Sequence, residues 1–231
     1  MRIGIIGAMD LEVKALREMM TISHTVRKAG TEFFAGQLGT AEAVVVRSGV
    51  GKVNAGLCVQ VLVDEFSVTQ IINIGVAGAL NPDLQIGDVV ISADALQHDM
   101  DASLLGFARG EIPYMGRATF DADHNLRRAA MIAAHEVLPD LRVIEGRVIS
   151  GDQFIASPEK KAQLVADFQG DCTEMEGAAV AQACALNDIP FLIVRAVSDK
   201  ADGSGKVNFE EFAAKSAANA SALVKRIIAL L

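Results

Sequence analysis

Short runs of β-branched residues alternate along the chain with stretches in which apolar residues recur at helical spacing. The short runs predict buried strands, and the amphipathic stretches predict helices that pack beside them. The predicted strands are Arg2–Ile6, Phe33–Leu38, Glu42–Arg47, Gln70–Gly75, Asp88–Ala93, Arg142–Ser150 and Phe191–Val197. The predicted helices are Asp10–Met20, Val53–Glu65, Asn125–Val137, Glu174–Leu186 and Asn208–Leu231.

Turn and capping residues refine this pattern. We expect Asp10 to cap the first helix, and Gly39-Thr40 to form the turn of a hairpin between two of the strands. A loop, Val76–Pro82, is expected to follow Gln70–Gly75, and the polar, glycine-containing segment Leu96–Arg117 is expected to be irregular. One face of the last helix is expected to collect Phe209, Phe212, Ser216, Leu223, Ile227 and Leu231.

The alternation of strands and helices predicts an α/β fold of three layers with a mixed central sheet. Phe191–Val197 is so apolar that we place it at the centre of that sheet. A chain of 231 residues can bury one sizeable core, and no linker or internal repeat divides it. We therefore expect residues 1–231 to form a single domain.

The composition is that of a globular protein with a small-molecule ligand. Hydrophobic residues make up 51% and charged residues 22%, and the net charge is −8 without any basic stretch, which argues against a nucleic-acid partner. No apolar run approaches the ~20 residues of a membrane span, and the first residues do not resemble a signal peptide. We expect a soluble, cytoplasmic protein with reduced, buried thiols at Cys58, Cys172 and Cys184.

Several common motifs are absent. The segment Gly49–Asn54 has Asn in place of the third glycine of a dinucleotide fingerprint, and Val53 follows Gly51-Lys52, so a Walker loop is excluded too. The segment is either a tight strand-to-helix turn or a loop that lines a ligand site. Ser150-Gly151-Asp152 does not match the nucleophile elbow of serine hydrolases.

The histidines also lack the spacing of a metal site. His98 lies in the acidic segment His98–Asp101, for which a solvated loop is the expected structure and cation binding the alternative. We expect no metal and no cofactor. The remaining histidines, expected at the surface or behind other site residues, are His24, His124 and His135.

Carboxylates at the ends of apolar strands are the most informative feature. Glu12 follows the first strand, Glu174 and Glu176 flank a strand-to-helix junction, and Asp199 follows Phe191–Val197. Ligands of open α/β sheets bind outside the carboxyl ends of the strands. Each residue alone is more often a cap than a site residue. Several of them on one rim favour a functional site, because clustered like charges raise the free energy of the fold.

Six blocks of sequence resemble the 5′-methylthioadenosine/S-adenosylhomocysteine nucleosidase family, within the nucleoside phosphorylase–nucleosidase superfamily. They are MRIGIIGAMDLEV, SGVGKVNAG, NIGVAGAL with IGDVV, ISGDQFI, EMEGAAVAQ and VRAVSD, in the family order. The first block begins at residue 1 and the last ends at residue 199, so the resemblance covers most of the chain. The resemblance implies a nucleoside phosphorylase-like α/β/α fold whose central mixed sheet is partly barrel-like.

The resemblance also implies the chemistry. Glu12 would be the general base that activates water, and Asp199 the general acid that protonates adenine N7. The base would leave from 5′-methylthioadenosine or S-adenosylhomocysteine, in methionine salvage and the recycling of S-adenosylmethionine by-products. Glu176 would bind the ribose hydroxyls, with Met175 beneath the sugar. The remaining implied substrate-binding residues are Met9, Val50, Val76, Gly78, Phe154, Ile155, Arg195, Ser198 and Phe209.

In this family Phe154 would stack on the base, backbone groups of Ile155 would read the adenine edge, and Phe209 would line the 5′-thio pocket. Relatives are homodimers, and the segment Ala102–Pro113 would complete the pocket of the neighbouring subunit. The residues implied there are Leu105, Phe107 and Pro113. Many relatives carry a hydroxyl residue where this chain has Val76, so a side-chain hydrogen bond from that position is absent.

The first loop separates two enzymes of this superfamily. Phosphorylases carry a GDPxR-type loop whose arginine helps to bind phosphate, whereas this chain has Gly7–Glu12 with the sequence GAMDLE. A glutamate in that place repels phosphate and favours water. Asp199 must then hold a proton at neutral pH while Glu12 stays ionised. The alternatives are a purine nucleoside phosphorylase of the same fold and a non-catalytic nucleoside-binding or storage protein.

Overall fold

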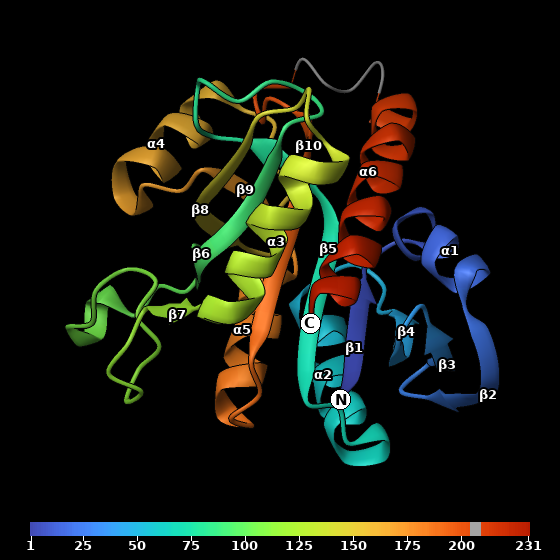
Figure 1. Cartoon of the computed structure of the whole chain (residues 1–231). Coiled ribbons are helices and arrows are strands. Elements are labelled where there is room, and N and C mark those ends of the chain that lie inside the picture. Colours follow the sequence, from blue (N-terminus) through green and yellow to red (C-terminus); the bar gives the residue numbers. More distant parts are fainter. Residues whose placement is uncertain (204–208) are drawn as a thin grey trace.

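A single mixed sheet runs through the chain, and part of it closes into a barrel (Figure 1). The computed structural model describes the backbone of residues 1–203 and 209–231, and the side chains of residues 1–203 and 214–231. The strands are β1 (Arg2–Gly7), β2 (Thr21–Lys28), β3 (Thr31–Leu38), β4 (Ala41–Arg47), β5 (Gln70–Ala79), β6 (Val89–Gln97), β7 (Thr119–Asp121), β8 (Val143–Ser150), β9 (Cys172–Glu174) and β10 (Phe191–Asp199). The helices are α1 (Asp10–Met19), α2 (Lys52–Phe66), α3 (His124–Val137), α4 (Pro158–Phe168), α5 (Gly177–Leu186) and α6 (Phe209–Leu230), with a short 3₁₀ turn at Ser103–Leu105.

The barrel forms because β10 pairs on both sides. It runs parallel to β5 and antiparallel to β6, which closes the circuit β10-β6-β8-β9-β5. The sheet then continues from β5 through β1, β4 and β3 to the edge strand β2. Parallel and antiparallel pairs both occur, so the prediction of a mixed, partly barrel-like sheet is confirmed. Every residue of β10 is buried, as expected for a central strand.

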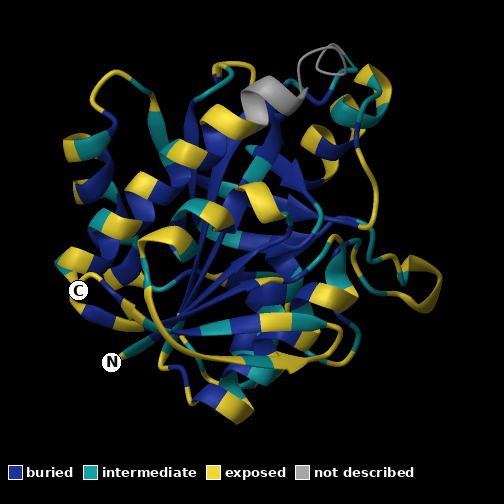
Figure 2. Ribbon diagram, turned by 90° about the vertical axis from the view of Figure 1, so that its right-hand side faces the viewer, coloured by how far each residue is buried: buried dark blue, intermediate teal, exposed yellow. Residues whose placement is uncertain are grey.

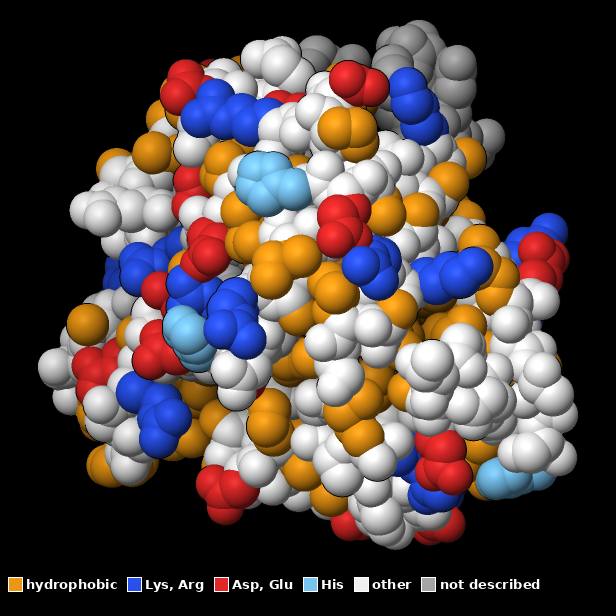
Figure 3. Space-filling view, viewed as in Figure 1, with side chains coloured by type: hydrophobic (Ala, Val, Ile, Leu, Met, Phe, Trp, Pro, Cys, Tyr) orange, Lys and Arg blue, Asp and Glu red, His pale blue; other side chains and the backbone are white. Residues whose placement is uncertain are grey.

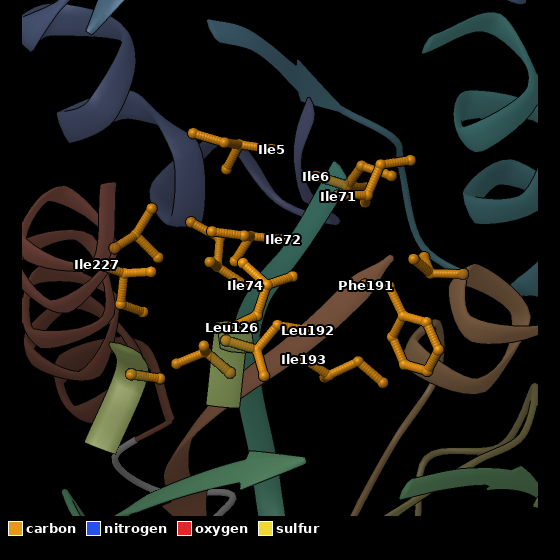
Figure 4. Close-up of a cluster of buried hydrophobic side chains, with 14 of the residues drawn as sticks. Ile5, Ile6, Ile71, Ile72, Ile74, Leu126, Phe191, Leu192, Ile193 and Ile227 are labelled. Carbon is orange, nitrogen blue, oxygen red and sulfur yellow. The ribbon is translucent and has the colours of Figure 1, made fainter. Parts of the chain in front are cut away.

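Helices cover the sheet on both faces. Helix α6 packs against α1 and α3, and α2 packs against α5. Neighbouring residues of the strands alternate between the two layers, so that Ile72 points toward Ile227 of α6 while Ile71 points to the other side (Figure 4). The continuous sheet is the observation that supports a single domain, which stays a prediction.

Exposure separates the core from the outer elements. Strand β10 is buried along its whole length, whereas the edge strand β2 is exposed at nearly every residue, and the burial colours of Figure 2 show the same contrast between core and surface. Lys and Arg side chains lie among Asp and Glu on the face shown in Figure 3. No helix among the described residues is long and apolar enough to cross a membrane.

Most predicted elements are present, with differences at their ends. Strand β5 continues to Ala79, so the first half of the predicted loop Val76–Pro82 is strand. The predicted helix Glu174–Leu186 begins at Gly177, because Glu174 still belongs to β9. Asp199 is the last residue of β10 and does not follow it. The turn at Gly39-Thr40 is confirmed by the antiparallel pairing of β3 with β4.

The expected N-cap of α1 is wrong, and the expected apolar face of α6 is confirmed only in part. The N-cap of α1 is Met9, and Asp10 is the first helical residue. Leu231 is 41% exposed, although Ser216, Leu223 and Ile227 are buried on the predicted face of α6. The side chains of Phe209 and Phe212 lie outside the part of the chain that the structure describes.

Candidate active site

A cavity of about 240 Å³ lies at the C-terminal ends of the parallel strands β1, β5 and β10. This is the rim where open α/β sheets bind ligands. Its lining combines apolar side chains with carboxylates. The residues that line the cavity are Ala8, Met9, Glu12, Val50, Val76, Ala77, Gly78, Gln153, Phe154, Ile155, Thr173, Glu174, Met175, Glu176, Ser198 and Asp199.

Glu12 enters the cavity from the first turn of α1. Its Oε2 accepts a hydrogen bond from the backbone N–H of Met9 (2.8 Å), and its Oε1 accepts one from the N–H of Val76 (3.1 Å). Burial raises the pKa of Glu12, and the two N–H groups together with the charge of Arg195 act in the opposite direction. The result is a buried carboxylate that is a stronger base than an exposed one, held in place by backbone donors.

The room for Glu12 depends on a glycine in β5. A Cβ atom at Gly75 would lie 2.8 Å from Oε1 of Glu12 and 3.4 Å from Cζ of Arg195. A side chain at this position would therefore collide with the carboxylate and displace it.

Asp199 lies at the end of β10 on the same cavity. Its Oδ2 is 2.9 Å from the hydroxyl oxygen of Ser198, and its Oδ1 accepts the N–H of Ala201 (2.7 Å). The side chain is only 7% exposed. Gly78 leaves space for it, because a Cβ atom there would lie 2.9 Å from Oδ1. The hydroxyl of Ser198 therefore helps to orient the Asp199 carboxyl group.

Glu176 precedes α5 and connects it to the loop before α2. Its Oε1 accepts the N–H of Gly51 (2.7 Å). Burial and the nearby charge of Glu174 raise the pKa of Glu176 to about 8. Gly49 and Gly51 both have positive φ, so the segment is a tight strand-to-helix turn, and it also places Val50 in the cavity. The tight turn is thus confirmed, and the role of the segment in lining a ligand site stays a prediction.

Arg195 does not line the cavity, although the sequence analysis places it among the substrate-binding residues. It is 1% exposed and lies behind the site. Its Nη2 lies 2.6 Å from Oε2 of Glu174, and every N–H of the guanidinium donates to Glu174, Val194 or Asn73. Although burial opposes ionisation, Arg195 and the Ser150 hydroxyl hold the pKa of Glu174 below its usual value.

Most of the other predicted residues meet at the cavity. Met9, Val50, Val76, Met175 and Phe154 contribute apolar side chains to its lining. Phe154 is 61% exposed, which leaves its ring available to a ligand. The residues that the sequence analysis missed are neighbours of motif residues, and their side-chain types alone carry no signal. They are Ala8, Ala77, Gln153 and Thr173, to which Glu174 is added as a lining residue.

The predicted residues of the segment Ala102–Pro113 do not reach the cavity of their own chain. Leu105 is 74% exposed, and Phe107 packs edge-on against Tyr114 with ring centroids 5.4 Å apart. The segment extends away from the barrel beside β7 (Figure 1). Pro113 likewise is not among the lining residues. The structure leaves the proposed role of this segment in a second subunit untested.

The acidic segment after β6 differs from the prediction. His98 is buried against Gly151, and burial lowers its pKa, so it is not part of a solvated loop. Asp99 forms an ion pair with Lys52 (2.6 Å) and accepts the N–H of Asp152 (2.9 Å). Asp152 in turn accepts the N–H of Lys52 (2.9 Å). The segment therefore connects the loops that carry Val50 and Phe154.

The expected buried thiols are confirmed at all three cysteines.

Comparison with known proteins supports the family that the sequence resemblance indicates. The phosphorylase superfamily model matches residues 2–229. A 5′-methylthioadenosine/S-adenosylhomocysteine nucleosidase of Shewanella pealeana is 41% identical over 233 residues, which cover 100% of this chain and 99% of the relative.

Two solved structures have nearly the same fold. The nucleosidase of Neisseria meningitidis in complex with methylthio-immucillin-A superposes with a TM-score of 0.96 at 38% identity, covering 100% of this chain and 99% of that one. A futalosine hydrolase of Helicobacter pylori has a TM-score of 0.94 at 32% identity, with 100% and 98% covered. The chain therefore belongs to the phosphorylase superfamily and, within it, to the 5′-methylthioadenosine/S-adenosylhomocysteine nucleosidases, a family of N-glycosyl hydrolases.

Proposed function

We propose that this chain hydrolyses the N-glycosidic bond of 5′-methylthioadenosine and S-adenosylhomocysteine, with Glu12 as general base and Asp199 as general acid. The observation that carries the proposal is the charge of the cavity. Its described lining residues include the carboxylates of Glu12, Glu174, Glu176 and Asp199, but no Lys, Arg or His. Without a cationic side chain, the lining offers no partner for a phosphate ion, and the ionised Glu12 carboxylate would repel it, which favours hydrolysis over phosphorolysis.

The reaction divides between the two carboxylates. Water adds to C1′ of the ribose and gives a proton to Glu12, while the C1′–N9 bond breaks and N7 of adenine takes a proton from Asp199. Adenine then leaves as a neutral molecule, and the transition state has positive charge on the sugar. Glycosidases that invert configuration use the same division between an acid and a base, with a water between them.

The cavity walls supply the substrate contacts. Glu176 would accept hydrogen bonds from the ribose hydroxyls, above the side chain of Met175. The exposed ring of Phe154 would stack on adenine, whose edge would meet the backbone of Ile155. Met9 and Val50 offer an apolar surface to the 5′-thio group, where each buried methylene contributes about 0.8 kcal/mol. Phe209 is proposed to extend that surface.

The decisive experiment measures products with and without phosphate. Incubation with 5′-methylthioadenosine in phosphate-free buffer is expected to release adenine and free 5-methylthioribose at the full rate. Strict dependence on phosphate, with a sugar 1-phosphate as product, would show a phosphorylase instead. Absence of turnover in both buffers, with binding of the nucleoside, would show a binding or storage protein.

Two substitutions test the assigned roles. Glu12→Gln and Asp199→Asn are each expected to lower kcat by about 10²–10⁴-fold, since proton transfer is worth roughly that much. Nucleoside binding, measured by calorimetry, should persist in Asp199→Asn. Asp10→Asn is the matched control for Glu12, because Asp10 is in the same helical turn and is exposed. A near-normal rate in either site variant would remove that residue from the mechanism.

We also propose a homodimer, cytoplasmic location and a role in methionine salvage. The exposed apolar residues Val53 and Leu57 of α2, Leu186 of α5 and Leu105 support the dimer, because such groups are commonly covered by a partner. The free, buried thiols support a reducing compartment. Sedimentation of the wild type and of Leu105→Glu tests the dimer: a monomeric wild type would contradict it.

A further inference from the structure

We infer that Lys161 is a positioning residue for Asp199 and acts through a single peptide group. The inference rests on the proposed role of Asp199 as general acid. Lys161 lies on α4, which is outside the sheet and does not line the cavity. Its ammonium nevertheless donates a hydrogen bond to the carbonyl oxygen of Lys200 (2.6 Å), immediately after Asp199.

The Lys200–Ala201 peptide group is held at both ends. Its oxygen accepts the ammonium of Lys161, and its N–H, which belongs to Ala201, donates to Oδ1 of Asp199 (2.7 Å). A trans peptide is planar, so its C=O and N–H point in opposite directions. By holding the oxygen, Lys161 therefore sets the direction in which the N–H meets the Asp199 carboxyl group.

The turn needs such an external contact. Ala201 has a φ of +53°, in the left-handed region that residues with a Cβ atom rarely adopt. Its side chain is fully buried in a small apolar cluster with Leu80 and Ile155. Gly203 follows with a φ of +84°, and a Cβ atom there would lie 2.8 Å from the carbonyl oxygen of Ala156. Strained backbone of this kind persists where the surrounding contacts over-determine it.

The hydrogen bonds of Lys161 and Asp199 to the Lys200–Ala201 peptide group, which we call the clamp, also bear on which oxygen of Asp199 carries the acidic proton. The N–H of Ala201 donates to Oδ1, and the carbonyl oxygen of a protonated carboxyl group accepts better than its hydroxyl oxygen, which favours Oδ1 as the carbonyl oxygen of the acid. The proton is then on Oδ2, beside the hydroxyl of Ser198 (2.9 Å). Oδ2 is the atom from which adenine N7 would receive it.

The positive charge of Lys161 also favours the role of Asp199 as a proton donor. When Asp199 gives up its proton it becomes negative, and an N–H polarised by an ammonium on the other side of the peptide stabilises that charge. The charged groups around Lys161 are Asp202, Lys200 and Asp199, and burial lowers the pKa of Lys161. Lys200 directs its own ammonium elsewhere, to Leu84 and Gln85. Lys161 is thus the ammonium that contacts this peptide group.

The test compares Lys161→Gln, Lys161→Arg and the control Lys160→Gln. Lys160 is the preceding residue of α4, and its ammonium lies 3.4 Å from the side chain of Gln163 at the surface. Lys161→Gln is expected to lower kcat by about 10–100-fold, as a slightly misplaced acid would, with KM changed less than about twofold. Loss of the positive charge is expected to move the basic limb of the kcat–pH profile to higher pH. Lys161→Arg should restore most of kcat, and Lys160→Gln should match the wild type.

A second measurement does not depend on activity. Amide hydrogen exchange of the segment 200–203 should be faster in Lys161→Gln than in the wild type and in Lys160→Gln. Wild-type kcat, pH profile and exchange in Lys161→Gln would overturn the inference, and so would a lower melting temperature with unchanged kcat per folded molecule. A wild type that does not hydrolyse 5′-methylthioadenosine would refute the proposed function instead, and the exchange experiment would still decide whether the clamp exists.

Discussion

The backbone N–H of Val76 donates a hydrogen bond to Oε1 of Glu12 across the floor of the cavity (3.1 Å). Val76 therefore contacts the proposed base through its backbone. Its side chain, which carries only apolar atoms, lines the same cavity as the buried Glu12 carboxylate.

Val76→Thr is expected to move the acid limb of the kcat/KM–pH profile to lower pH, by about half a unit or more. Burial raises the pKa of Glu12, and ionised Glu12 is the active form, so activity falls as pH drops through that raised pKa. A hydroxyl group that donates to the carboxylate favours the ionised form. Threonine keeps the size and β-branching of valine. Val76→Ala controls for volume, and an acid limb at the same pH in Val76→Thr and the wild type would contradict the prediction.

Arg195→Met is expected to reduce the free energy of unfolding by about 3–5 kcal/mol, because it leaves Glu174 as a buried charge without its partner. Adding Glu174→Gln should recover part of the loss. Urea denaturation measures both. Glu42→Gln is the control, since the pair of Glu42 with Arg2 is largely exposed and should be worth less than about 1 kcal/mol. Equal effects of Arg195→Met and Glu42→Gln would show that burial of the pair has no energetic consequence.

The unliganded protein is expected to lose stability as pH rises, through Glu176. Its pKa is raised from 4.5 to about 8, so the folded state binds a proton that the unfolded state releases in that range. The free energy of unfolding therefore falls by up to roughly 1.4 kcal/mol per pH unit as pH rises between those two pKa values. Glu176→Gln keeps an acceptor for Gly51 and removes this titration. In thermal melting from pH 5 to pH 9, the stability of the variant should rise relative to that of the wild type as pH increases. Parallel plots of melting temperature against pH would exclude the effect.

Gly78→Ala is expected to lower kcat by about 10-fold or more, because its Cβ atom would lie 2.9 Å from both Oδ1 of Asp199 and Cβ of Ala201. Steady-state kinetics on the folded variant measure the change. Gly56→Ala is the matched control: nothing lies within 4 Å of its Cβ position, and its place in α2 favours alanine by about 0.5–1 kcal/mol. Unchanged kcat in Gly78→Ala would show that Asp199 has freedom to move.

Local pattern was sufficient for the strands whose apolar runs are continuous. Gln70–Gly75 and Phe191–Val197 were predicted within a few residues because strands buried on both faces need apolar side chains at every position. The missed elements lack that signal. β2 lies at an exposed edge, and β7 and β9 have three residues each. Helix α4 was missed although Ser157 and Pro158 form an ordinary helix start.

The candidate site followed partly from position and partly from the family resemblance. Glu12, Glu176 and Asp199 end or follow strands, and the structure brings all three to one cavity. Their hydrogen-bond partners were not predictable, because Gly51, Val76 and Ala201 contribute backbone N–H groups, which every non-proline residue carries. The position of Arg195 behind the cavity could not be predicted from the sequence either.

The sequence by itself determined the alternation of strands and helices, the family, and which carboxylates stand at the carboxyl ends of strands. These properties depend on side-chain type and on spacing between near neighbours. The tertiary structure alone decided that β10 closes a barrel, that Arg195 neutralises Glu174, and that Lys161 reaches the turn after Asp199. Each of these joins residues distant in the chain, and their contact depends on how the whole sheet closes and not on any local pattern.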